Sequence, residues 1–260
     1  MSGALPLAGR HALVTGAARG IGAAIARRLA ADGATLTLLG RHEDTLQALA
    51  RELPGVAQAR TLVCDVADAA SVARAWQALE AAGADVHVLV NNAGQAASAP
   101  LVKTTDELWQ RMLAVNLTGT FNCCRAALPA MLRGGWGRIV NVASTAGQRG
   151  YAYVGAYAAA KHGVIGLTRS LALEVGSKGV TVNAVCPGFT ETDLLTDSIA
   201  KVVATTGRDA EAARREFTRH NPQGRLVRPQ EVADAVAWLC TAGAGSVNGQ
   251  SLSISGGEVM

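Results

Sequence analysis

A tyrosine and a lysine stand four positions apart in the segment Tyr157-Ala-Ala-Ala-Lys161, and Ser144 precedes them. Residues four apart lie on one face of a helix, with their Cβ atoms roughly 5–6 Å from each other. An ammonium at that distance favours the phenolate and lowers a tyrosine pKa that is otherwise about 10. Such a tyrosine can act as a general acid or base near neutral pH, as the reduction of a ketone or the oxidation of an alcohol requires. The spacing alone is also common on helix surfaces, so the rest of the chain has to support this chemistry.

A glycine-rich turn follows the first apolar segment of the chain. Residues 11–15 predict a short strand, and residues 23–31 have the apolar spacing of a helix. Gly16, Gly20 and Gly22 stand between them. Glycines at a strand-to-helix turn let the backbone approach a pyrophosphate, which the helix N-terminus stabilises. The spacing Gly-x-x-x-Gly-x-Gly departs from the general dinucleotide fingerprint, and a tight turn without a ligand is the alternative.

Together these motifs resemble the short-chain dehydrogenase/reductase family. The resemblance extends from about Leu7 to Met260 and rests on six segments in the family's order: Thr15-Gly-Ala-Ala-Arg-Gly-Ile-Gly22, Asn91-Asn-Ala-Gly94, Asn116, Ser144, Tyr157 with Lys161, and Pro187-Gly188. Within the family the chain is similar to 3-oxoacyl thioester reductases, 3-hydroxybutyrate dehydrogenases and aromatic polyketide ketoreductases. The resemblance implies an oxidoreductase that transfers a hydride between a nicotinamide cofactor and a ketone or secondary alcohol.

The resemblance implies a catalytic set of Asn116, Ser144, Tyr157 and Lys161. In that set Ser144 would hydrogen-bond the carbonyl oxygen of the substrate, and Tyr157 would donate the proton. Lys161 would lower the pKa of Tyr157 and hold the nicotinamide ribose, while Asn116 would hold a water that passes protons to Lys161. An ordinary amide at a helix interface is the alternative for Asn116.

The resemblance also implies the residues that bind the cofactor. They are Gly16, Arg19, Gly20, Ile21, Gly22, Arg41, Asp65, Val66, Asn92, Ala93, Gly94, Tyr157, Lys161, Pro187, Gly188, Thr190 and Thr192. An NAD-specific domain places Asp or Glu at the end of its second strand to bind the ribose 2′-hydroxyl, whereas this chain has Gly40 and Arg41. Nothing there repels a 2′-phosphate, and an arginine is a bidentate partner for one. We therefore expect NADP, with NAD as the alternative if Arg41 only stacks on the adenine or lies on the surface.

The substrate is expected to contact Gln95, Ser144, Gln148, Tyr151, Phe189 and Leu194, although Tyr151 also suits a packing role. We expect a ketone or alcohol, above all a 3-oxoacyl or 3-hydroxyacyl thioester of coenzyme A or an acyl carrier. One alternative is an NAD-dependent secondary-alcohol dehydrogenase of a cyclic alcohol or hydroxy acid. Another is a scaffold or cofactor sensor without catalysis, which the presence of Ser144, Tyr157 and Lys161 disfavours.

Residues 189–221 interrupt the alternation of strands and helices and predict a substrate lid, because ligands of such sheets bind beyond the carboxyl ends of the strands. A helical hairpin at an interface is the alternative. The lid carries a basic group that could attract the phosphates of a thioester: Arg208, Arg214, Arg215, Arg219 and His220. A solvated helix face balanced by acidic neighbours is the alternative for this group.

Apolar strand candidates alternate with helical patterns, which predicts a doubly wound parallel sheet covered by helices on both faces. We expect seven strands near 11–15, 34–39, 59–64, 86–91, 137–143, 180–185 and 250–254. We expect helices near 20–32, 42–53, 69–83, 105–133, 152–177 and 229–241. No linker or repeat breaks the pattern, so residues 1–260 are expected to form one Rossmann-like α/β domain.

Composition agrees with this assignment and disfavours other classes. The 260 residues are 49% hydrophobic, enough for a sizeable core. The net charge of +4 comes from scattered basic residues without an aromatic-rich stripe, so no nucleic-acid binding is expected. No apolar run reaches the ~18 residues of a membrane span, and neither a secretory signal nor a metal-ligand cluster is recognisable. The five cysteines fall in apolar segments, which suits reduced thiols in a cytoplasmic protein.

The helices near 105–133 and 152–177 carry more apolar positions than one buried stripe needs, among them Leu167, Leu171, Leu173 and Val175. Surplus apolar faces indicate a subunit interface, and relatives in the family pair these helices in homotetramers with two-fold axes. We expect a homotetramer, with a fully internal helix as the alternative.

Overall fold

The structure is a computed structural model that describes residues 5–53, 59–207 and 209–260. Its centre is a seven-stranded sheet with the order β3-β2-β1-β4-β5-β6-β7, in which every neighbouring pair is parallel. The strands are β1 (His11–Thr15), β2 (Thr35–Gly40), β3 (Arg60–Val63), β4 (Val88–Asn91), β5 (Gly137–Val142), β6 (Val180–Pro187) and β7 (Ser251–Ile254). The predicted fold class, a doubly wound Rossmann-like sheet of seven strands, is confirmed.

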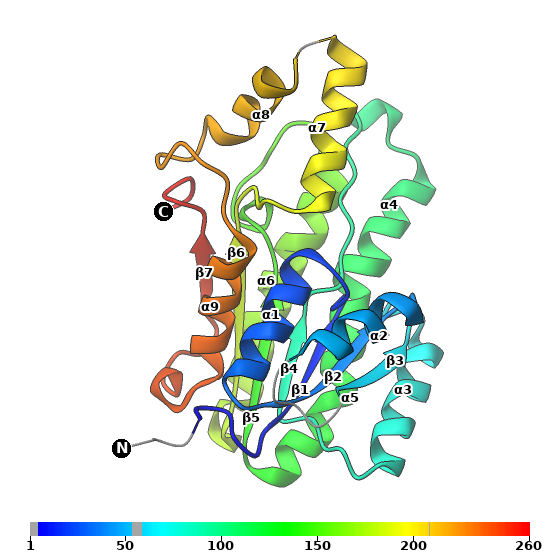
Figure 1. Cartoon of the computed structure of the whole chain (residues 1–260), viewed down its shortest axis with the longest axis vertical. Helices are drawn as coiled ribbons and strands as arrows, with labels where there is room; N and C mark the ends of the chain where they lie inside the picture. Colours follow the sequence, from blue (N-terminus) through cyan, green and yellow to red (C-terminus); the bar gives the residue numbers. More distant parts are fainter. Residues whose placement is uncertain (1–4, 54–58, 208) are drawn as a thin grey trace.

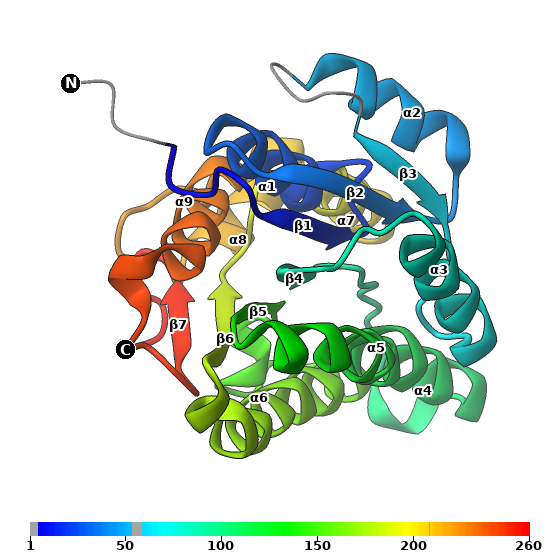
Figure 2. The same cartoon turned by 90° about the horizontal axis from the view of Figure 1, so that it is seen from below.

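Helices cover both faces of the sheet. Figure 2 shows α1, α2 and α9 on one face and α3, α4, α5 and α6 on the other. The helices are α1 (Gly20–Ala31), α2 (Glu43–Glu52), α3 (Ala69–Ala81), α4 (Asp106–Leu113), α5 (Gly119–Gly134), α6 (Gly155–Val175), α7 (Asp193–Thr206), α8 (Ala210–Thr218) and α9 (Pro229–Cys240). Because both faces are covered, β1, β4, β5 and β6 are buried along their whole length. A hydrophobic cluster lies on each face.

The strand order reverses at β1, which lies between β2 and β4. In open parallel sheets ligands bind at such a reversal, beyond the carboxyl ends of the strands. The glycine turn follows β1 at this edge, Ser144 follows β5, and Gly188 follows β6. Three motifs that are far apart in the sequence are therefore brought to one edge of the sheet.

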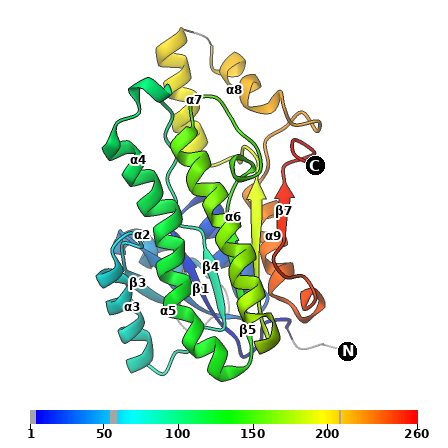
Figure 3. The ribbon, with the colours of Figure 1, turned by 180° about the vertical axis from the view of Figure 1, so that it is seen from behind.

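The helix expected over 105–133 is interrupted, which corrects the prediction in one detail. A π-helical turn, Ala114–Thr118, separates α4 from α5. Figure 3 shows α4, α5 and α6 together on this face of the sheet. Asn116 lies in the π turn and is fully buried. Such turns are frequent at functional sites.

Residues 189–221 contain two helices, α7 and α8, which lie beyond the carboxyl edge of the sheet (Figure 1). Asp209 begins α8, since its carboxylate accepts the N–H of Ala212 at 2.7 Å. Thr190 forms a bridge with Val227, so the two ends of the segment meet at the sheet edge. This placement is compatible with a lid, which remains a prediction.

The apolar positions expected at a subunit interface divide into two groups. Leu171 and Val175 belong to the core between α6 and the sheet, which agrees with the alternative of a fully internal helix. Leu173 is 87% exposed, and large apolar side chains are also exposed on and before α4 and on α5: Leu101, Val102, Trp109 and Phe121. Among the residues that the structure describes, no helix has the length and apolar character to cross a membrane.

Candidate active site

Ser144, Tyr157 and Lys161 meet at the carboxyl edge of the sheet. Ser144 lies just beyond β5, and Tyr157 and Lys161 are one turn apart on α6. The Ser144 hydroxyl forms a hydrogen bond with the Tyr157 phenol. The Lys161 ammonium donates to the carbonyl oxygen of Val142 at 2.8 Å and lies 5.7 Å from the centroid of the Tyr157 ring. The structure thus brings together the three groups that the sequence singled out.

The backbone fixes the Ser144 hydroxyl in this arrangement. Its Oγ accepts the N–H of Ala146 at 3.1 Å and begins the 3₁₀ turn Thr145–Gly147. A hydroxyl has two acceptor lone pairs and one hydrogen, so this contact leaves the hydrogen available to an oxygen on the other side. A substrate carbonyl oxygen placed beside Tyr157 would be such an acceptor.

Burial controls the pKa of both groups on α6. It raises the pKa of Tyr157, and the hydrogen bond with Ser144 only partly opposes this. It also lowers the pKa of Lys161 to about 8. The pKa of Tyr157 is therefore raised in the chain by itself, where a lowered value was expected, because loss of hydration outweighs the groups that favour the phenolate. Tyr157 is held protonated, the form that donates a proton to a carbonyl.

Asn116 is fixed by backbone groups at both ends of its amide. Its Nδ2 donates to the carbonyl oxygens of Gln95 at 2.9 Å and Met112 at 3.0 Å, and its Oδ1 accepts the N–H of Gln95 at 3.2 Å. A Cβ added to Gly94 would lie 2.9 Å from Asn116 Oδ1 and 3.7 Å from Lys161 Nζ. Gly94 therefore lets the loop after β4 approach Asn116 and Lys161 together. The water that Asn116 is expected to hold remains a prediction.

A buried polar chain beneath the site links β4, β5 and α6. Asn91 donates from Nδ2 to Asn141 Oδ1 at 2.8 Å, and Asn141 donates from Nδ2 to Thr168 Oγ1 at 2.9 Å. Asn141 and Thr168 are completely buried. Because these bonds are made away from water, breaking one is costly. They fix α6 against β5, and so Tyr157 and Lys161 against Ser144. Sequence reasoning missed this chain, although an asparagine inside an apolar strand was the available signal.

The glycine turn has the geometry of a phosphate cradle. Gly16 and Gly20 have φ angles of +61° and +54°, which favour glycine. A Cβ on Gly22 would collide with the Gly16 carbonyl oxygen. Arg19 begins α1 without a side-chain cap, so the first N–H groups of the helix face the turn. Ile21 is partly buried against the core beneath.

The loop after β4 is held against this turn. Asn92 donates from Nδ2 to the carbonyl oxygens of Thr15 and Gly16, both at 3.0 Å. The Ala93 N–H donates to Thr15 Oγ1 at 2.9 Å. Asn92, Ala93 and Gly94 consequently form one wall of the edge that the glycine turn opens.

Arg41 and Asp65 lie at the far end of this edge. Arg41 directly follows β2 and is exposed, and no carboxylate occupies positions 40 or 41. Asp65 is exposed after β3, and its carboxylate accepts the N–H of Ala67 at 3.0 Å. Val66 is buried, and its carbonyl oxygen accepts from Asn122 at 3.0 Å.

The turn after β6 closes the other side. Thr190 donates from Oγ1 to the Gly188 carbonyl oxygen at 2.9 Å, and Thr192 donates from Oγ1 to the Thr190 carbonyl oxygen at 3.3 Å. A Cβ on Gly20 would lie 3.2 Å from Thr192 Cγ2, so this turn touches the glycine turn. Pro187 ends β6 immediately before it. The cradle, the uncapped helix and these walls fit a dinucleotide.

Aromatic residues line the end of the site that faces α8. Phe189 packs edge-on against Tyr151 at 6.3 Å and against Phe217 of α8 at 5.0 Å between ring centroids. The Tyr151 hydroxyl donates to Glu258 Oε1 at 2.6 Å and accepts from Thr145 Oγ1 at 2.9 Å. Gln95 stays beside Asn116, as described above.

Gln148 lies elsewhere, which corrects its placement in the substrate pocket. Its Nε2 donates to the Ser251 carbonyl oxygen at 3.0 Å, and its Oε1 accepts from Ser253 at 2.8 Å. Both ends of the amide are thus held by β7, because the 3₁₀ turn after Ser144 rotates this side chain away from Tyr157. Leu194 belongs to α7, and its side chain lies outside the described residues.

The sequence and the structure of this chain are similar to those of known proteins. The short chain dehydrogenase family matches residues 10–202. The chain belongs to this family. A putative ketoacyl reductase of Streptomyces coelicolor is 42% identical over 251 residues, 95% of each chain. The 3-oxoacyl-(acyl-carrier-protein) reductase of Escherichia coli K12 is 39% identical over 256 residues, 97% of this chain and 98% of that one. The structure of an actinorhodin polyketide ketoreductase variant with NADPH has a TM-score of 0.91 and 39% identity over 96% of this chain and 97% of that one.

As a member of the short chain dehydrogenase family, the chain is an oxidoreductase. The resemblance inferred from the six motifs is confirmed.

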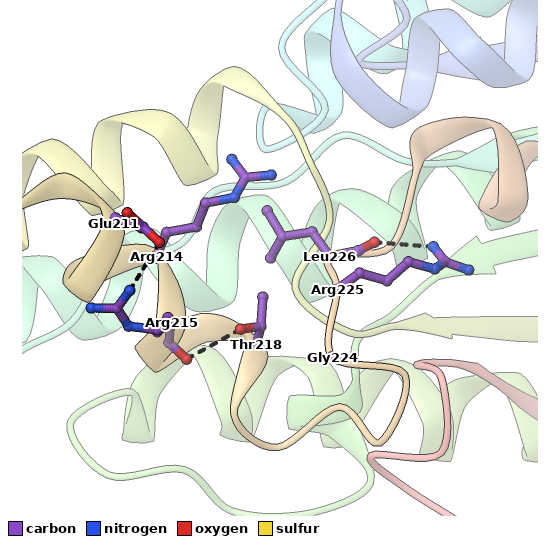
Figure 4. A pocket seen from close by; sticks show the side chains of 7 residues that line it. All are labelled: Glu211, Arg214, Arg215, Thr218, Gly224, Arg225 and Leu226. Atoms are coloured by element: carbon purple, nitrogen blue, oxygen red, sulfur yellow. Dashed lines mark hydrogen bonds and ion pairs between the residues drawn. The ribbon is translucent and has the colours of Figure 1, made fainter.

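The basic group of the lid is not a convergent clamp in this short chain dehydrogenase. A hollow of about 260 Å³ lies between α8 and the segment that follows it. Figure 4 shows that Arg214, Arg215 and Arg225, which line it, point away from one another. Arg214 pairs with Glu191 at 2.6 Å, and Arg215 pairs with Glu211 at 3.0 Å. Such exposed pairs favour the alternative of a balanced, solvated helix face. Arg208 lies outside the described residues.

Sequence reasoning missed three groups at the substrate end: Thr145, Phe217 and Glu258. Thr145 and Phe217 are neighbours of predicted residues and become visible only through contacts. The signal for Glu258 was the glycine pair Gly256-Gly257, which allows a sharp change in chain direction after β7.

Proposed function

We propose that this short chain dehydrogenase uses NADPH to reduce the 3-keto group of an acyl thioester or a related ketone. The observation that carries the proposal is the convergence of Ser144, Tyr157 and Lys161 beside an uncapped glycine turn at the switch point of the sheet. The ketoacyl and 3-oxoacyl reductases that resemble the chain over nearly its whole length support this class of substrate.

The nicotinamide, when bound, supplies the hydride that adds to the carbonyl carbon. Ser144 donates a hydrogen bond to the carbonyl oxygen and so stabilises the negative charge that develops there. Tyr157 transfers its phenolic proton to that oxygen, and the raised pKa of Tyr157 keeps this proton in place beforehand. Lys161, with its pKa of about 8, stabilises the phenolate left behind.

Several features support NADPH as the cofactor. The exposed Arg41 after β2 and Arg19 at the start of α1 are arginines suited to a 2′-phosphate. The structural neighbour described above was solved with NADPH. Asp65, Val66, Asn92 and Ala93 would then contact the adenosine half, and Pro187, Gly188, Thr190 and Thr192 the nicotinamide half.

We also infer assembly and location. The exposed apolar side chains on α4, α5 and α6, such as Leu173 and Phe121, favour a homotetramer built on these helices. All five cysteines are buried free thiols, which suits the reducing cytoplasm. Light scattering at micromolar concentration tests the assembly, and a monomeric mass would contradict it.

The decisive experiment follows the NADPH absorbance band while the purified protein is given acetoacetyl-CoA, cyclic ketones and aryl ketones, each with NADPH and with NADH. We expect the highest kcat/KM with NADPH and the thioester, and loss of turnover in Tyr157→Phe. Turnover confined to NADH and cyclic or hydroxy-acid substrates would replace the proposal with a secondary-alcohol dehydrogenase. Cofactor binding without any turnover would indicate a cofactor sensor.

A further inference from the structure

The chain after β7 returns to the active-site edge and packs against the end of the lid segment. Gly256 and Gly257 have φ angles of +63° and +95°. A Cβ on Gly256 would collide with the side chain of Asn221, and one on Gly257 would lie 3.2 Å from Pro222 Cγ. Both glycines are therefore required for the close passage. The passage places Glu258, the next residue, beside Tyr151 and Gly188. Figure 1 shows the C-terminal segment returning toward α8 beyond the end of β7.

The Glu258 carboxylate is hydrogen-bonded through one oxygen, and its other oxygen lies close to the turn after β6. Oε1 accepts the Tyr151 hydroxyl at 2.6 Å. Oε2 lies 2.9 Å from the position that a Cβ on Gly188 would take, so the carboxylate rests directly on the turn after β6. The backbone supports this placement, since the Glu258 N–H donates to the Ser255 carbonyl oxygen at 3.3 Å.

These contacts locate the charge relative to the reacting groups. Gly188 follows Pro187 in the turn assigned to the nicotinamide side. Tyr151 also accepts a hydrogen bond from Thr145, the neighbour of Ser144. Glu258 thus stands between the two segments that flank the substrate carbonyl. Arg149 lies on the other side of Tyr151, with its guanidinium over the ring at 4.8 Å, and donates to the Glu258 backbone carbonyl at 3.5 Å.

We propose that Glu258 sets the charge selectivity of the active site, admitting uncharged 3-keto substrates and repelling those that carry a carboxylate beside the ketone. The inference rests on the proposed function and narrows its substrate class to thioesters and neutral ketones, against free 3-oxo acids. A fixed negative charge inside a partly desolvated site repels a second one more strongly than water would allow. Burial and the bond to Glu258 raise the pKa of Tyr151 to about 12, so Tyr151 remains a donor that holds the carboxylate in place.

The test compares two substrates that carry the same 3-keto group, one ending in a carboxylate and one in an uncharged thioester: acetoacetate and the acetoacetyl thioester of N-acetylcysteamine. The selectivity is the ratio of their kcat/KM values with NADPH. We expect the wild type to favour the neutral thioester, and Glu258→Gln to lower this selectivity about tenfold, mostly by improving acetoacetate. Glu258→Asp keeps the charge and should keep most of the selectivity.

The matched control is Glu80→Gln, which removes the same charge from an exposed position on α3 and should leave the selectivity unchanged. Unchanged selectivity in a folded Glu258→Gln would overturn the inference. Equal kcat/KM for both substrates in the wild type would overturn it as well, even if the variant failed to fold. Absence of turnover with every ketone would instead overturn the proposed function, and the inference with it.

Discussion

Gly94→Ala tests whether the loop after β4 positions Asn116 and Lys161. The added Cβ would lie 2.9 Å from Asn116 Oδ1, closer than Cβ atoms approach such neighbours, but at an ordinary 3.7 Å from Lys161 Nζ. Asn116 must therefore move, while the bond between Lys161 and Val142 can persist. Movement of Oδ1 breaks its 3.2 Å contact with the Gln95 N–H and leaves a buried acceptor without a donor. This costs about 1–3 kcal/mol of folding stability.

The assay combines thermal unfolding with steady-state kinetics. For a chain of this size each kcal/mol lowers Tm by roughly 2–4 °C. If Asn116 serves proton transfer, kcat should fall more than NADPH affinity. The control is Gly134→Ala, whose added Cβ has no atom within 4 Å and which should keep both Tm and kcat. A Gly94→Ala protein that behaves like this control would refute the role assigned to the loop.

Three further predictions concern the proton donor, the cofactor and pH. Tyr157→Phe should lower kcat by about 10²–10⁴-fold with little change in NADPH affinity. Lys161→Ala should lower both kcat and NADPH affinity. Near-normal turnover of the phenylalanine variant in single-turnover assays would exclude Tyr157 as the acid. Arg41→Ala should weaken NADPH relative to NADH by about 1–3 kcal/mol in fluorescence titrations, and an equal loss for both cofactors would mean that Arg41 stacks on adenine. Burial lowers the pKa of His11, whose Nε2 lies 2.9 Å from Thr37 Oγ1. The neutral form of His11 therefore stabilises the fold above the unfolded pKa of about 6.5, and this contribution disappears as pH falls through the lowered folded pKa. The Tm of the wild type should consequently fall further than that of His11→Gln between about pH 7 and about pH 4.

The elements of the fold could be predicted because each is encoded locally. Apolar runs such as Val88–Asn91 and Gly137–Val142 are bounded by polar or glycine-containing turns, and their continuous burial follows from the helices on both faces. Tyr157 and Lys161 were placed correctly relative to each other because a helix fixes residues four apart. The parallel topology then carries Ser144 to the same edge.

What the sequence did not reveal depends on contacts between segments that are far apart in the chain. The π turn at Asn116 is a single turn within a longer helical segment, and a change of hydrogen-bond spacing over one turn has no sequence signal of its own. Gln148 follows Ser144 closely, yet its direction is set by Ser251 and Ser253 of β7. The pKa of Tyr157 was expected to fall from its spacing to Lys161, but burial by the surrounding elements raises it.

Glu258 shows how far such contacts can change a functional interpretation. By composition the last residues are an unremarkable tail, and no local pattern connects them with Tyr151, which precedes them by more than a hundred positions. The positive φ angles of Gly256 and Gly257 supply the connection, because they turn the tail onto Asn221 and Pro222 at the end of the lid segment. Catalysis in this chain is thus encoded in short motifs that a helix or a strand end positions. The proposed control of substrate choice by Glu258 depends instead on where the predicted lid, the turn after β6 and the C-terminal residues meet, and that meeting point is a property of the folded chain.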